Sequence, residues 1–505
     1  MNAIIPRRSF LKSALSTTTL LGLGNLSFLS RLPSVSAAEA KMDSKLVRFS
    51  AEIEPLVRLL EDTSRERLLE EVGMRIRRGL AYRELVAALL LAGVRNIQPR
   101  PVGFKFHAVL VINSAHMASM NSPDGDRWLP IFWALDQFKA SQTRNKQEGD
   151  WHMPALDETT IPPSHKAKQA FVEAMDNWDE AAADVAAAGL ARHVPPQDCF
   201  EIFCRFGARD FRDIGHKAIY TANSWRTLQT IGWQFSEPVL RSLAYALLQH
   251  EGENPSKRDG EPDRPLRRNQ QRIGKLRDDW QAGKNDATAT SEMLTTFRKG
   301  SSDEACDKVV ELLGRGAGPQ SIWDALFQAA NEMLMRKPGI TTLHSCTSAN
   351  ALHYAYQNTG SDETRRLLLL QNAAFIPLFR DRGGAQTGVE IDKIEPEPPK
   401  ESGDKAVEEI FADLSSDKMQ AARKALSYLK TSARPKPFLD AAQRLIYLKG
   451  SDAHDYKFSS AVFEDYQHLS PSVRDHYLAA SVFWLRDSGQ RDNSLVQRTR
   501  DALKS

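Results

Sequence analysis

The stretch FHAVLVINSAHMA, residues 106–118, contains a histidine, an asparagine six residues later and a second histidine three residues after that. The same spacing returns in LHSCTSANALHYA, residues 343–355. Neither stretch shows the strict alternation of apolar and polar residues that is typical of a half-buried β-strand. Because helical periodicity dominates the rest of the chain as well, we predict an all-α fold.

Four segments of the chain share one plan, in which an amphipathic helix is followed by a loop, a helix that opens at a histidine, and a further helix. The leading histidines are His107, His216, His344 and His454. The predicted upstream helices are 82–96, 198–210, 321–334 and 438–450. The predicted downstream helices are 126–138, 236–249, 362–376 and 470–485. The two opening stretches are therefore interpreted as the same helix in units one and three.

The expected architecture follows from this repetition. We predict about four repeated three-helix units, packed as a helical solenoid or toroid around a central cavity lined by histidines. Units one to three occupy residues 41–380, a Pro- and Gly-containing linker occupies 381–405, and unit four with a C-terminal tail occupies 406–505. The alternative is a chance alignment, since any all-α chain can be laid against itself with one histidine per segment.

The leading histidine of each unit is the candidate functional residue. A histidine in the opening turn of a helix lies near the positive end of the macrodipole, which favours the neutral imidazole that a metal ion requires. The position nine residues later holds His116, Trp225, His353 and Phe463, so it accepts any large ring and is interpreted as a packing position. Nine residues also place the two histidines of one helix on opposite sides.

Polar residues near these histidines extend the candidate site. Asp210, Asp213 and Asp452 precede His216 or His454, where each carboxylate can cap the helix or hold an imidazole N–H. Asn113, Asn223 and Asn350 follow their histidines by six or seven residues, on nearly the same helical face, and indicate a polar cavity. A metal site formed by His107, His216, His344 and His454 has no acidic ligand, which favours Fe, Cu or Zn over Mg or Ca.

The first forty residues resemble a twin-arginine export signal. Arg7 and Arg8 precede a mildly apolar run that ends at the small residues around Ala37 and Ala40. We therefore expect export to the periplasm through the twin-arginine translocase, no stable membrane span, and cleavage near residue 40. The formal net charge of +3 lies in this segment, so nothing in the remainder favours nucleic acid as a partner. The four cysteines follow no zinc or haem spacing and are expected to be buried thiols.

The segments FHAVLVINSAHMAS, RDFRDIGHKAIYTA and TTLHSCTSANALHY resemble the histidine-led helices of the questin oxidase-like family. The resemblance covers most of residues 80–485 and implies an all-helical fold. It also implies an oxidoreductase that inserts oxygen into an aromatic polyketide, with His107, His216 and His344 in the site. The family's fungal activity is associated with NADPH, which an exported protein does not meet, so this cofactor is not expected here.

Three functions remain open from the sequence. The first is an exported oxidoreductase or oxygenase that acts on a small, aromatic substrate at the four histidines. The second is a metal-assisted hydrolase or lyase, which predicts a long open groove. The third is a non-catalytic helical repeat that binds a partner, which predicts that the four histidines lie far apart.

Overall fold

The computed structural model describes residues 45–432 and 435–504, and residues 47–505 group into one compact unit. The described residues are almost entirely helical and contain no β-strand, which confirms the predicted all-α fold. No helix among them is both long enough and apolar enough to cross a bilayer. The predicted export signal, residues 1–40, lies outside the described residues.

Each unit contains the helices that the sequence predicts. The upstream helices are α4 (Tyr82–Asn96), α10 (Pro196–Gly207), α16 (Pro319–Arg336) and α21 (Lys436–Lys449). The histidine-led helices are α5 (His107–Leu110) continued by α6 (Ile112–Met120), α11 (His216–Ile231), α17 (Ile340–Asn358) and α22 (Ala453–His468). The downstream helices are α7 (Leu129–Gln147), α12 (Ser236–Leu247), α18 (Asp362–Gly383) and α23 (Arg474–Ala480).

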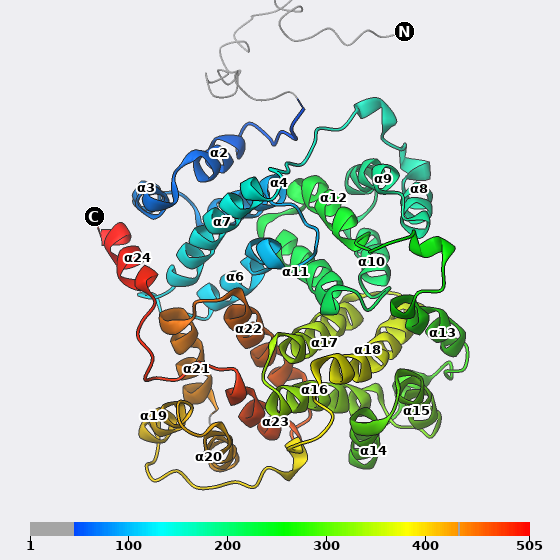
Figure 1. The fold of residues 1–505 in the computed structure, drawn as a ribbon, viewed down its shortest axis with the longest axis vertical. Helices are drawn as coiled ribbons and strands as arrows, with labels where there is room; N and C mark the ends of the chain where they lie inside the picture. Colours follow the sequence, from blue (N-terminus) through cyan, green and yellow to red (C-terminus); the bar gives the residue numbers. More distant parts are fainter. Residues whose placement is uncertain (1–44, 433–434, 505) are drawn as a thin grey trace, which may run out of the picture. The chain divides into compact units, whose positions relative to one another are not determined.

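The four histidine-led helices form an inner ring (α6, α11, α17 and α22), which Figure 1 shows in the middle of the helices around it. Helix α6 packs against α11, α11 against α17, α17 against α22, and α22 returns to α6. The last unit therefore contacts the first. Whether the four units are true repeats, stacked as a solenoid or toroid, stays a prediction.

Further helices lie between the units. They are α2 (Glu54–Asp62), α3 (Arg65–Arg77), α8 (Ser164–Asn177), α9 (Glu180–His193), α13 (Arg264–Ile273), α14 (Ala287–Lys299), α15 (Ser302–Gly314), α19 (Asp404–Asp413), α20 (Lys418–Thr431) and α24 (Ser494–Lys504). The mixed charges, Pro and Gly of residues 250–272 are typical of an exposed loop, but the second half of this stretch belongs to helix α13. That helix is held by the buried Arg272, which pairs with Asp303 and Asp307 on α15.

Two hydrophobic cores flank the inner ring. One core is formed mainly by units one and two, and the other mainly by units three and four. Helix α6 contributes to the first and α17 to the second, whereas α11 and α22 contribute to both: Ile219 and Tyr220 face different cores, as do Phe458 and Tyr456. The inner ring therefore lies where the two cores meet, and its remaining polar faces are free to line a cavity.

Candidate metal centre

The four leading histidines converge at one end of the inner ring. The ring centroid of His107 lies 4.9 Å from that of His216 and 4.5 Å from that of His454. His344 lies 4.2 Å from His216 and 5.0 Å from His454. His216, His344 and His454 are buried, and His107 is partly exposed. The predicted convergence of these imidazoles is therefore observed.

Each of the four imidazoles is held through its Nδ1 atom. His107 Nδ1 bonds to the carbonyl of Phe104 at 2.9 Å, and His216 Nδ1 bonds to that of Asp213 at 2.5 Å. His344 Nδ1 bonds to the carbonyl of Ile340 at 2.7 Å. His454 Nδ1 contacts a carboxylate oxygen of Asp452. Since carbonyls and carboxylates only accept hydrogen bonds, every Nδ1 carries the proton and every Nε2 of a neutral ring presents a lone pair.

These lone pairs face one another, and no single group in the described part of the chain donates a hydrogen bond to all of them. The Nε2 atoms of His107 and His216 are 3.0 Å apart, which is repulsive unless a proton or a metal ion lies between them. The Nε2 atom of His454 is buried and has no hydrogen-bond partner in the described part of the chain. An orphaned buried acceptor is costly, so this arrangement indicates a site suited to a cation.

The electrostatics of the centre favour a metal ion over a shared proton. Burial lowers the pKa of His107, His216 and His344 well below the ordinary value of 6.5, and the charge of Lys457 lowers each further. Lys457 Nζ lies 3.3 Å from His344 Nε2, and burial lowers its own pKa to about 7. At neutral pH the imidazoles of His107, His216 and His344 are therefore neutral, the form that ligates metals.

The ligand distances are compatible with a metal ion. One ring nitrogen from each of His107, His344 and His454 lies within 4.8 Å of the others. Two ligands of a tetrahedral ion with bonds of 2.0–2.1 Å are roughly 3.3 Å apart. The three rings would close in slightly around an ion, while His216 already lies at ligand spacing from His107. These histidines can hold a metal ion.

Local backbone geometry explains how two of the rings are aimed. Asp213, Ile214 and Gly215 have φ values of 52°, 44° and 79°, so three successive residues adopt left-handed conformations immediately before His216. This turn brings the Asp213 carbonyl under the imidazole. His344 departs from the prediction: α17 begins at Ile340, so His344 lies one turn inside the helix rather than in its opening turn, and its Nδ1 bonds to the Ile340 carbonyl one turn earlier.

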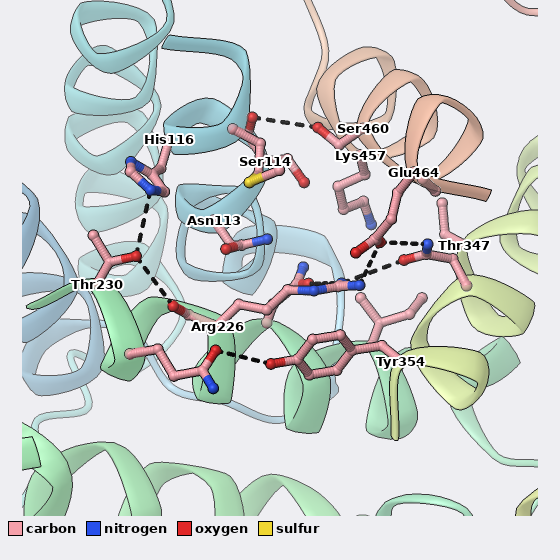
Figure 2. Close-up of a pocket in the computed structure, with 16 residues that line it drawn as sticks. Asn113, Ser114, His116, Arg226, Thr230, Thr347, Tyr354, Lys457, Ser460 and Glu464 are labelled. Carbon is pink, nitrogen blue, oxygen red and sulfur yellow. Dashed lines mark hydrogen bonds and ion pairs between the residues drawn. The ribbon is translucent and has the colours of Figure 1, made fainter. Parts of the chain in front are cut away.

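A polar chamber of about 290 Å³ lies along the inner ring beside the centre, and Figure 2 shows its labelled walls. Its lining residues repeat by helical turns from each histidine, because positions three, seven and ten residues later share a face. The first turn supplies Ile219, Thr347 and Lys457, the second Asn113, Ser114, Asn223, Asn350, Ser460 and Ala461, and the third Met117, Arg226, Tyr354 and Glu464. Lys457 contacts both the chamber and the centre.

An ion pair lies at the far end of the chamber. Arg226 forms an ion pair with Glu464 and donates to the side-chain carbonyls of Asn223 at 3.2 Å and Asn350 at 3.3 Å. Its guanidinium also lies 4.0 Å from the centroid of the Tyr354 ring. A second cavity of about 440 Å³ shares Met117, Ser460 and Glu464 with the chamber. This second cavity therefore adjoins the polar chamber on the side of α21.

The other predicted residues have distinct places. Asn113, Asn223 and Asn350 line the chamber, as the predicted polar cavity requires. Asp213 holds His216 by its backbone carbonyl, while burial raises the pKa of its own carboxyl to about 6. Asp210 does not face an imidazole: it pairs with Lys217 at 2.8 Å and with Arg212 at 3.3 Å, so its predicted role as an imidazole partner is wrong.

The two histidines that lie nine residues after a leading histidine, His116 and His353, have different surroundings. His353 is buried against Trp323 at 4.6 Å and Phe327 at 5.1 Å, which confirms packing. His116 is half-buried, forms hydrogen bonds with Tyr82 through Nδ1 and with Thr230 through Nε2, and lines the chamber, so the packing interpretation is incomplete there. Sequence reasoning missed Lys457, Arg226, Tyr354 and Glu464, although their spacing from the histidines could have indicated them.

Comparison with known proteins gives no match: no protein-family model matches the chain, and neither a curated protein nor a solved structure matches it. The chemistry of the centre is therefore argued from its own side chains.

Proposed function

We propose that this chain is a transition-metal oxidoreductase, which oxidises a small molecule in the polar chamber with dioxygen. The metal is held by His107, His344 and His454, with His216 as the fourth histidine. The observation that carries the proposal is the set of four imidazoles, each fixed through Nδ1 and turned with Nε2 towards the others. Such outer hydrogen bonds orient histidine ligands in metal sites.

The ligand chemistry supports Fe or Cu. Imidazole suits Zn, Cu and Fe, and a site without carboxylates leaves the full charge of the ion in place. Zinc has no redox chemistry, so an oxidoreductase that uses dioxygen at its metal requires one of the other two metals. The resemblance to questin oxidase-like proteins supports the same class, while export makes dioxygen a more accessible co-reactant than NADPH. Export through the twin-arginine pathway is part of the proposal, because the leading forty residues carry its signal pattern.

A metal-assisted hydrolase or lyase is the second candidate, because a zinc ion at the same histidines could activate water. That function predicts a long open groove for a polymer, whereas the chamber of about 290 Å³ lies among four helices and suits a small molecule. A non-catalytic repeat predicts scattered histidines, and the separations of 4.2–6.2 Å between their ring centroids do not favour it.

Metal analysis of protein purified without a histidine tag tests the proposal. We expect about one Fe or Cu ion per chain, and loss of at least nine-tenths of it in His344→Ala and His454→Ala. His165→Ala, on the exposed start of α8, is the matched control and should keep the metal. Protein that contains only zinc and consumes no oxygen would favour the hydrolase. Protein that binds none of the three metals would overturn both.

A further inference from the structure

Most of the side chains that line the chamber carry a polar group. Of the residues that line it, only Met117, Ile219 and Ala461 have purely apolar or thioether side chains. Tyr354 is the one large aromatic side chain besides the imidazole of His116, and the guanidinium of Arg226 already covers its face at 4.0 Å. A planar aromatic ligand would therefore find no free ring on which to stack.

The charged side chains at the far end of the chamber compensate one another. Arg226 is paired with Glu464, and Glu464 also accepts from Asn350 Nδ2 at 2.7 Å. Asn350 Nδ2 donates further to Asp465 at 2.8 Å, and Asn223 Nδ2 donates to the Leu110 carbonyl at 3.0 Å. This network leaves no uncompensated charge at the far end for an anionic ligand.

One wall of the chamber carries polar groups that have no protein partner. Asn113 is only 4% exposed, points into the chamber in Figure 2, and its amide has no hydrogen-bond partner among the described residues. The hydroxyl of Ser114, only 3% exposed, likewise has none in the described part of the chain. An amide presents a donor and an acceptor side by side, so both groups of Asn113 are available to a ligand in the chamber.

We propose that the chamber binds a small, neutral, polyhydroxylated molecule, of the size and chemistry of a sugar alcohol, with Asn113 as a positioning residue. A hydroxyl group donates and accepts at once, so neighbouring hydroxyls match the Asn113 amide and the Ser114 hydroxyl. The identification of this ligand as the substrate rests on the proposed function. The chemistry of the chamber is independent of that function. The proposal replaces the aromatic substrate that the family resemblance implies.

Binding of three defined probes tests the proposal: sorbitol, 1-naphthol and benzoate, each titrated calorimetrically into the full chain. We expect sorbitol to bind with a Kd in the millimolar range or below, and the other two to bind at least tenfold more weakly. Asn113→Leu should weaken sorbitol binding at least tenfold. Asn372→Leu is the matched control, since the Asn372 amide nitrogen is also buried and unpartnered but lies outside the chamber; it should change binding less than twofold.

Each outcome decides between the two proposals. Preference for 1-naphthol or benzoate, absence of sorbitol binding, or an unchanged Kd in Asn113→Leu would overturn the polyhydroxylated ligand. Metal content is measured on the same samples and should be equal in wild type and Asn113→Leu. Sorbitol binding by a chain that holds no metal would overturn the proposed function and leave the ligand class standing.

Discussion

Gly103 lies against the two histidines whose Nε2 atoms face each other. A Cβ atom at this position would stand 3.3 Å from both Cε1 and Nε2 of His216 and 3.6 Å from Cε1 of His107. Its φ of +123° is also one that L-residues rarely adopt. The missing side chain therefore leaves room for the imidazole pair, and the backbone of this one residue helps to determine the spacing of the ligands.

Gly103→Ala should damage the metal centre selectively. We expect its metal affinity to fall at least tenfold, because the new methyl group displaces the His216 ring, with a stability loss of about 1–3 kcal/mol from the strained φ. Gly149→Ala is the control, since Gly149 has a φ of +117° and no atom within 4 Å of the added Cβ. It should lose similar stability and keep its metal. Equal metal affinity in both variants, measured by competition with a chelator, would contradict the argument.

The residues of the centre were predictable where a pattern runs along one helix. His107, His216, His344 and His454 were predictable because each lies at or near the start of a corresponding helix, and Asn113 and Asn350 because they follow at helical spacing. The ion pair between Arg226 and Glu464 was not predictable, since it joins α11 to α22 and depends on how two helices sit beside each other. The same limit applies to Lys457, whose partner His344 belongs to another helix.

At the scale of elements, helix existence was easier to predict than helix ends. Helix α4 begins and ends where the periodicity of residues 82–96 places it. Helix α17 begins earlier than the histidine-based alignment suggests, because Gly339 and the following Ile340 allow another turn before His344. Helix α5 ends at Leu110 and α6 begins at Ile112, so the first histidine-led helix is interrupted where the sequence predicts continuity.

The packing of α17 against α16 predicts a pH effect. Burial, together with the nearby His468 and Arg226, lowers the pKa of His353 to about 3. Below pH 6.5 the unfolded chain takes up a proton that the folded chain excludes, so the free energy of unfolding falls as pH decreases from 6.5 to about 3. The contribution of this one group is at most about 1.4 kcal/mol per pH unit.

His353→Phe should flatten this dependence. Phenylalanine already occupies the corresponding position of unit four, at Phe463, and the surroundings of His353 are the rings of Trp323 and Phe327. We expect little change in unfolding free energy at pH 7.5 and a smaller loss at pH 5 than in wild type, measured by urea unfolding of metal-free protein. His165→Phe, at an exposed position, should keep the wild-type slope. Parallel slopes in all three proteins would exclude His353 as the source.

In the unit formed by residues 47–505, helices from its first part contact helices from its last part at two places. Inside, α22 contacts α6, where Ser460 Oγ donates to the Ser114 carbonyl at 3.3 Å. Outside, α24 packs on α3, where Arg498 donates to Glu70 at 2.8 Å. The sequence leaves the inner closure open, since both a solenoid and a toroid fit it, and does not predict the outer one. The inner contact joins two of the helices that carry the leading histidines, while the outer one covers the apolar face of α3.

Gly73→Ala separates these two closures. The added Cβ would stand 2.3 Å from the carbonyl oxygen of Ala502, so α24 must move away from α3, and we expect a loss of about 1–3 kcal/mol in unfolding free energy. Gly314→Ala, at the end of α15 with no atom within 4 Å, should instead gain up to about 1 kcal/mol from helix propensity. Metal content should stay at the wild-type level in both, because α6 and α22 still touch directly. A loss of metal in Gly73→Ala alone would mean that the outer contact, and not the inner ring, holds the four imidazoles together.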